Sequence, residues 1–113
     1  MSYWSEIEAG MAYLEQRTAD FEEDIKAAAQ AEYEYRKAKA HALKEERAKG
    51  TPATIMRDLI FDQPDVQKAF LERAMTSAVA DADKEAINTI KKKLQLLDAQ
   101  EARDWQAAGS RGY

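Results

Sequence analysis

Gly50-Thr51-Pro52 and Gln63-Pro64 contain the only two prolines of the chain, and these two stretches decide its expected architecture. Proline and glycine interrupt helices more strongly than other residues do. On either side run long segments without proline, rich in Ala, Glu, Lys, Leu and Gln. This layout predicts an all-α fold. Two long helices form an antiparallel, coiled-coil-like hairpin, and a short third helix lies at the bend.

Capping signals set the expected bounds of the three helices. Gly50 follows a basic residue and suits the first position beyond a helix end. Thr51-Pro52 suits the N-cap and first position of the next helix, and Asp62-Gln63-Pro64 offers the same signal again. We therefore expect a single domain over residues 1–113. Its expected parts are helices at about 2–49, 52–61 and 64–107 and a frayed tail at 109–113.

Apolar residues of the first long segment recur in alternating steps of three and four, which predicts a heptad seam. The expected seam is Trp4, Ile7, Met11, Leu14, Thr18, Phe21, Ile25 and Ala28. The third segment carries its expected apolar face at Val66, Phe70, Ala74, Ala78, Ala82, Ala86, Ile90, Leu94, Leu97 and Trp105, widened by Leu71, Met75, Val79 and Ile87. Such wide faces need more cover than one helix provides, so we expect a homo-oligomer or a docked partner.

Two details of this arrangement follow from the same pattern. Cap-like residues near Thr18 and Asp20 offer a place for the first helix to break, but no proline or glycine enforces a stop, and we favour a continuous helix. Trp4 and Trp105 are expected to meet at the open end of the hairpin, since its two helices are antiparallel.

Several classes of chemistry have no residues to carry them. The chain has no cysteine, which excludes disulfides, zinc–thiolate sites and thiol catalysis. His41 is the only histidine and has no glutamate three residues before it, unlike helical di-metal sites. The glycines are too far apart to form a phosphate-binding loop. We predict no enzymatic activity, no metal and no cofactor.

The distribution of apolar residues also bears on location. No apolar run approaches the roughly 18–20 residues that span a bilayer. The first residues lack the basic and apolar regions of a signal peptide. We therefore expect a soluble cytoplasmic protein that does not contact membranes.

Acidic residues dominate the first third of the chain. Residues 1–35 hold nine acidic and two basic side chains, although the whole chain carries a net charge of only −4. The acidic arm, defined as Glu22, Glu23 and Asp24, could imitate a phosphate backbone and occupy the nucleic-acid groove of another protein. Exposed aromatic side chains anchor many interfaces, so Tyr33 and Tyr35 join the acidic arm as predicted partner-binding residues.

Basic residues support an alternative. The side chains concerned are Arg36, Lys37, Lys39, Lys44, Lys91, Lys92 and Lys93. They could contact nucleic-acid phosphates while the nearby tyrosines stack on bases. A solvated helix face with pairs between residues four apart is the simpler interpretation of both the acidic and the basic cluster, and the acidity of the chain favours it over nucleic-acid binding.

A wider pattern covers most of the chain. It comprises Ala38-Lys39-Ala40 in its alanine-rich flank, the break at Gly50-Thr51-Pro52, then Asp62-Gln63-Pro64-Asp65-Val66 and the closing Leu94-Gln95-Leu96-Leu97. This pattern resembles small helical proteins encoded by phages and prophages among their early replication and recombination genes.

Small phage proteins of this size include inhibitors of bacterial defence, among them anti-CRISPR proteins. The resemblance therefore implies a phage-encoded binder in the cytoplasm of a bacterial host, and an inhibitor of a nucleic-acid-handling defence complex is our first hypothesis. A nucleic-acid-binding accessory protein of phage replication or recombination, and a self-assembling structural coiled coil, are the alternatives.

Overall fold

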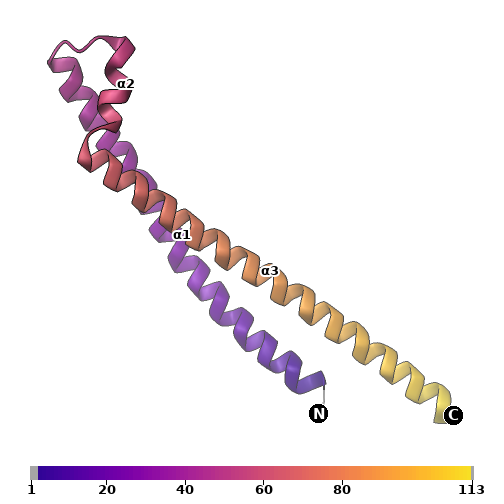
Figure 1. Cartoon of the computed structure of the whole chain (residues 1–113). Coiled ribbons are helices and arrows are strands. Elements are labelled where there is room, and N and C mark those ends of the chain that lie inside the picture. The colour runs from indigo at the N-terminus through magenta and orange to yellow at the C-terminus, as the bar shows by residue number, and fades with distance from the viewer. Residues whose placement is uncertain (1–2, 113) are drawn as a thin grey trace. The chain divides into compact units, whose positions relative to one another are not determined.

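The computed structural model describes residues 3–112, with the side chains of residues 3–109. Its described part consists of three helices, α1 (Tyr3–Ala48), α2 (Ala53–Phe61) and α3 (Pro64–Gly112), without a β-strand (Figure 1). The all-α prediction is confirmed. α1 continues without a break through Thr18 and Asp20, as predicted, because no proline or glycine lies near these residues.

The chain divides into two compact units. The terminal unit contains the residues up to Glu22 and those from Ala82 onward, and the bend unit contains Glu23–Asp81. Each unit pairs a segment of α1 with a segment of α3. In the bend unit Glu32 contacts Arg73 and Tyr35 contacts Phe70, so the two segments are antiparallel. A hairpin continuous over both units stays a prediction.

α1 ends in the bend unit through a glycine that has a positive φ. Gly50 has a φ of 73°. Its N–H donates to the Arg47 carbonyl oxygen at 3.1 Å, and the Thr51 N–H donates to the Glu46 carbonyl oxygen at 3.1 Å. These two bonds form a Schellman motif, which satisfies carbonyl groups at the helix end and favours glycine at the left-handed position.

Thr51 does not cap α2, contrary to the prediction. Pro52 occupies the N-cap position, and no side chain caps the helix start. The Thr51 hydroxyl instead donates to the carboxylate of Glu46 at 2.7 Å. The prediction was wrong because this nearby buried carboxylate, which the local pattern does not reveal, competes for the hydroxyl. Pro64 begins α3 as expected.

Glu46 links the three chain segments of the bend. It is only 6% exposed. Besides Thr51, its carboxylate accepts a hydrogen bond from the Gln63 side chain at 3.5 Å and lies 3.6 Å from Lys49 Nζ. The Thr51 hydrogen bond, followed by the charge of Lys49, lowers the pKa of Glu46, although burial opposes this. The carboxylate therefore stays ionised and holds the end of α1 beside the start of α3.

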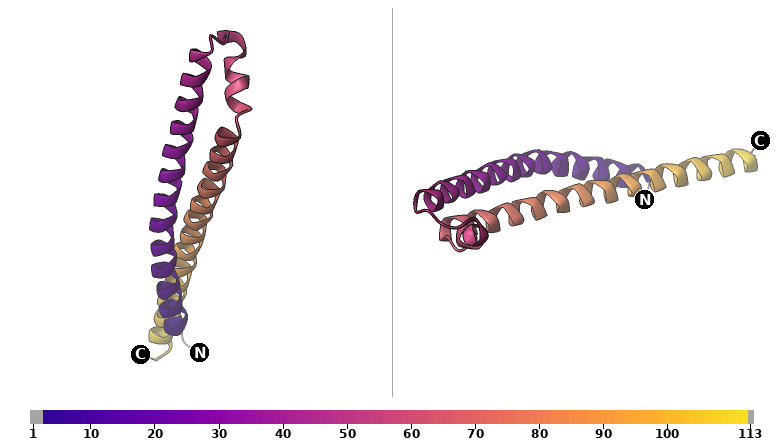
Figure 2. Two further views of the ribbon diagram at one scale, coloured as in Figure 1. Left: turned by 90° about the vertical axis from the view of Figure 1, so that its left-hand side faces the viewer. Right: turned by 90° about the horizontal axis from the view of Figure 1, so that it is seen from above.

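The core of the bend unit joins all three helices. Tyr35 and Ala42 of α1, Ile60 of α2 and Val66 of α3 are buried together. Figure 2 shows α2 between the end of α1 and the start of α3. The partly buried side chains packed around this cluster are Ala38, Leu43, Met56, Phe61 and Ala69. α2 thus covers apolar surface that the two long helices alone would leave exposed.

The terminal unit packs α1 and α3 through small and polar residues as well as apolar ones. A Cβ atom placed on Gly10 would lie 2.7 Å from a methyl group of Leu94, so glycine makes room for this leucine. Arg17 Nη2 donates to Asp83 Oδ1 at 2.7 Å, and Asp83 is only 4% exposed. Near the chain ends, a hydrogen bond with Asp104 raises the pKa of the Tyr3 hydroxyl.

The predicted seam of α1 is correct at every second position only. In the two units Ile7, Leu14, Phe21 and Ala28 are partly buried, as predicted. The alternating members Trp4, Met11, Thr18 and Ile25 are exposed, and the residues one position earlier, Tyr3, Gly10, Arg17 and Asp24, are partly buried instead. The pattern missed these residues because it selects large apolar side chains, whereas the actual seam accepts a glycine and two charged residues.

The predicted face of α3 is also partly wrong. The buried or partly buried members of the predicted face and its widening are Val66, Ala86, Ile87, Ile90, Leu94 and Leu97. The exposed members are Phe70, Leu71, Ala74, Met75, Ala78, Val79, Ala82 and Trp105. Steps of four rotate by about 40° each around a helix, so such a series leaves the contact line that steps of three and four would follow. Arg73, Thr76, Ala80 and Asp83 occupy that line instead.

α3 also extends further than predicted. The helix continues to Gly112 instead of ending at 107, so residues 109–112 are helical and not frayed. Tyr113 lies outside the described residues.

Candidate docking surfaces

Large apolar side chains lie on the outside of both units. In the bend unit the exposed set is Ile25, Tyr33, Ile55, Phe70, Leu71, Met75 and Val79. In the terminal unit it is Trp4, Met11, Tyr13, Leu96 and Trp105. Contiguous exposed apolar surface marks sites of interaction.

One face of the bend unit carries an apolar groove between α1 and α3. We call it the alanine groove, defined by Ala27, Ala31, Ala38, Ala69, Met75 and Val79. Its larger part has a volume of about 550 Å³. The alanines keep the groove shallow and smooth, while Met75 and Val79 are 56% and 50% exposed on its α3 side. Such a surface fits the apolar face of another helix.

The rim of the alanine groove is acidic. Glu34, Asp65 and Glu72 border it together with a single basic residue, Lys68. All three carboxylates are exposed, and none forms an ion pair with another described residue. Glu34 accepts one hydrogen bond, from the Gln30 amide at 3.0 Å. The rim therefore presents negative charge to whatever lies in the groove.

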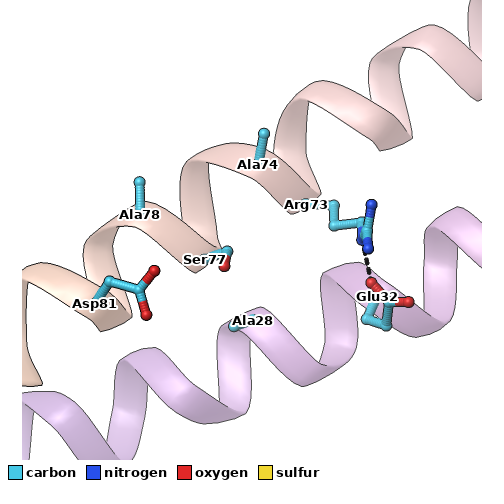
Figure 3. Close-up of a pocket in the computed structure, with 7 residues that line it drawn as sticks. All are labelled: Ala28, Glu32, Arg73, Ala74, Ser77, Ala78 and Asp81. Carbon is cyan, nitrogen blue, oxygen red and sulfur yellow. Dashed lines mark hydrogen bonds and ion pairs between the residues drawn. The ribbon is translucent and has the colours of Figure 1, made fainter.

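The opposite face of the bend unit carries a second groove that is crossed by an ion pair. Its lining is Ala28, Glu32, Arg73, Ala74, Ser77, Ala78 and Asp81. Figure 3 shows Arg73 of α3 reaching Glu32 of α1 at one end of this groove. Hydrogen bonds from Arg36 and from Arg73 lower the pKa of Glu32. In this groove Glu32 is neutralised by Arg73, and Asp81 is the other charged residue of the lining.

Tyr35 is a core residue, so the prediction of an exposed Tyr35 was wrong. Its side chain is only 6% exposed and packs edge-on against Phe70 at 5.8 Å between ring centroids. Lys39 Nζ and Arg73 Cζ each lie 5.1 Å from the centroid of the Tyr35 ring. The tyrosine is held by cation–π contacts inside the bend unit. Tyr33, in contrast, is 60% exposed as predicted.

The acidic arm falls on both sides of the boundary between the units. Glu22 belongs to the terminal unit, whereas Glu23 and Asp24 belong to the bend unit. Glu22 and Glu23 are exposed, and Glu23 lies 3.7 Å from Lys26 in an exposed pair. Asp24 is partly buried and borders the alanine groove beside Ala27. Only Glu22 and Glu23 are therefore fully presented to solvent.

The basic residues of the alternative hypothesis do not form one site within a unit. Arg36, Lys37, Lys39 and Lys44 lie in the bend unit, whereas Lys91, Lys92 and Lys93 lie in the terminal unit. All seven are exposed. Arg36 pairs with Glu32 at 2.9 Å, and Lys39 lies over Tyr35, so these two side chains already have intramolecular contacts. His41 is exposed beside Glu45 at 3.1 Å.

The two tryptophans do not contact each other, contrary to the prediction. They are 59% and 81% exposed, and the ring contacts of residues 3–109 involve only Tyr35, Phe61 and Phe70. The prediction placed the two tryptophans at the same level, and the preceding residues Tyr3 and Asp104 do interact there, but Tyr3 is the partly buried residue while both tryptophans are exposed. Trp105 borders a shallow hollow with Asp98, Glu101 and Ala102.

Two further features concern the described residues as a whole. No helix in this part of the chain combines the length and hydropathy needed to cross a membrane. Among the same residues, no three His, Asp or Glu side chains gather in a way that would hold a metal ion.

Comparisons with protein-family models, curated proteins and solved structures find no match for this chain. The resemblance to phage proteins therefore stays a prediction.

Sequence reasoning did not find the alanine groove. Its lining comes from helix positions that the predicted seam left aside, chiefly alanines, and alanine gives no strong periodic signal. Leu71, Met75 and Val79 recur at intervals of four and were assigned to the widened intramolecular face. A series of apolar residues at a constant interval of four was the available sequence signal that this stripe lies outside the contact between α1 and α3.

Proposed function

We propose that this protein acts without catalysis, by binding another protein on its exposed helix faces. The observation that supports the proposal is the placement of its apolar side chains. Twelve large apolar residues of the described chain are exposed, whereas seven apolar residues are buried and three of those are alanines. A chain that stays alone in water gains nothing from this distribution, because burial of apolar surface drives both folding and association.

The polar content of the helix contacts supports the same proposal. Arg17 and Asp83 lie at a contact between α1 and α3, and so do Glu32 and Arg73. These contact positions are occupied by charged residues, while large apolar residues are exposed. An arrangement with the apolar residues at the contact and the charged residues in water would stabilise the free chain more, so the exposed apolar residues are better explained by a partner that covers them.

The resemblance to phage proteins gives this proposal its specific form. In that form the chain is a phage-encoded inhibitor that binds a host nucleic-acid-handling complex in the bacterial cytoplasm, and the acidic arm replaces a phosphate backbone. Its helices would form one long hairpin, and copies of the chain would associate through exposed apolar residues of the terminal unit, such as Met11. Exposed Glu22, Glu23 and Tyr33 are the contact residues that suit this form.

Capture from a bacterial lysate tests whether the protein binds another protein. Tagged full-length chain is incubated with untreated and, in parallel, with nuclease-treated lysate, and retained proteins are identified, purified and recombined with the chain. We expect a complex of defined stoichiometry in sedimentation analysis, with or without nuclease. The proposal is contradicted if no protein is retained, or if retention requires intact nucleic acid, a result that would favour the accessory-protein alternative.

Charge reversal tests the contribution of the acidic arm. In the recombined complex, Glu22→Lys combined with Glu23→Lys should weaken binding, because two lysine ammonium groups would then repel the basic partner surface that the two carboxylates attract. Glu85→Lys combined with Glu101→Lys is the matched control, since these residues are also exposed in helices and change the net charge equally. Equal affinities of the two double variants would remove the arm from the interface.

A further inference from the structure

We propose that the alanine groove of the bend unit binds one amphipathic helix with basic flanks from a partner protein. This inference rests on the proposed function and names the partner chemistry for one surface. The groove spans α1 from Asp24 to Ala38 and α3 from Asp65 to Val79. At 1.5 Å per residue each span corresponds to roughly 21 Å, the length of about four helical turns.

The floor and walls of the groove select a helix with apolar residues on one face. Ala27, Ala31 and Ala69 carry no side chain beyond Cβ, so a third helix backbone can approach closely and pack its own larger side chains between them. Met75 lies on the α3 side, 56% exposed, and its flexible thioether adapts to partners of different shape.

The rim selects the charge of that helix. Glu34, Asp65 and Glu72 are exposed and form no ion pair with other described residues, and Lys68 is the one basic residue in the described lining of the groove. Lys or Arg residues flanking the apolar face of a bound helix would meet these carboxylates. Complementary rim charges add specificity and speed association, while the apolar floor supplies most of the burial.

The same charges argue against other occupants. A second copy placed face to face on the groove would bring Glu34 and Glu72 toward their own equivalents, and like charges across an interface are unfavourable. Nucleic acids carry phosphates that the rim would repel. A helix with basic flanks is the occupant that satisfies both the apolar floor and the acidic rim.

Titration with two designed peptides tests this inference. Both are 18-residue amphipathic helices with the same leucine and alanine face, but one has lysines on the flanks and the other has glutamates. At low salt we expect the full-length chain to bind the lysine peptide about tenfold more tightly, as a few exposed charge pairs would give. Amide resonances of Ala31, Ala69 and Met75 should shift, and salt should reduce the preference.

Charge reversal of the rim provides the matched comparison. Glu34→Lys combined with Glu72→Lys should reverse the preference toward the glutamate peptide, whereas Glu8→Lys combined with Glu85→Lys in the terminal unit should leave it unchanged. All four residues are exposed, so we expect both variants to fold. Helicity in circular dichroism equal to that of the unsubstituted chain checks this expectation.

Three results would overturn the inference. The first is equal affinity of the chain for the two peptides, and the second is the same peptide preference in the two double variants. The third is a dimer of the chain that forms without peptide and shifts the amide resonances of the groove relative to those of the monomer. The natural complex captured from lysate distinguishes this failure from that of the proposed function. If it forms as tightly with the Glu34/Glu72 variant, the groove is not the docking site, although protein binding itself stands.

Discussion

At the scale of single residues, the Arg17–Asp83 pair shows how a helix contact tolerates charge. Asp83 is buried, and one of its oxygens accepts from Arg17 at 2.7 Å. The other oxygen, and Arg17 Nε, have no hydrogen-bond partner among the described residues. Such a pair adds little net stability, because desolvation of the charges offsets their attraction. It does fix which residues of α1 and α3 face each other.

This balance predicts different effects for single and double substitution. Arg17→Leu should destabilise the protein by about 2 kcal/mol, because Asp83 would remain as a buried carboxylate without its partner. Arg17→Leu combined with Asp83→Leu should recover most of that loss, since the site becomes apolar. Urea unfolding followed by circular dichroism measures both. A double variant that is no more stable than the single one would show that the pair itself contributes stability.

At the scale of helices, the bend was predictable and the helix contacts were only partly so. Gly50 and Pro64 act through their own backbone preferences, so local sequence suffices to place the end of α1 and the start of α3. The side-chain role of Thr51 was missed because it depends on Glu46, which is not a recognisable capping partner. The contact line was missed at Gly10, Arg17 and Asp83, because none of these residues has a large apolar side chain.

The bend makes a prediction about glycine substitutions. Gly50→Ala should cost about 1 kcal/mol, because alanine pays a steric penalty at a positive φ. Gly109→Ala is the control: it is exposed within α3, a new Cβ atom meets nothing within 4 Å, and alanine favours the helix. Thermal unfolding should therefore shift downward for the first variant and stay level or rise for the second. A Gly50→Ala protein as stable as the unsubstituted one would contradict the Schellman ending of α1.

At the scale of the whole molecule, the placement of apolar surface carries the functional account. The alanine groove became visible only when the two helix segments of the bend unit were paired, because its lining comes from both. The spacing of apolar residues predicted helix faces that need extra cover, but it did not indicate which of their side chains would be exposed. The identity of the partner depends on complementarity with another molecule, which no pattern within one chain encodes.

Hydroxyl-radical footprinting of the methionines tests most directly whether a partner covers the exposed face. Met75 is 56% exposed at the alanine groove, and Met56 is partly buried against the bend core. We predict that Met75 oxidises readily in the free chain and severalfold more slowly in the complex purified from lysate, while Met56 reacts at the same slow rate in both. Equal oxidation of Met75 in the free and bound chain would contradict the claim that a partner covers this face, because the apolar side chains would then remain exposed to water in the complex.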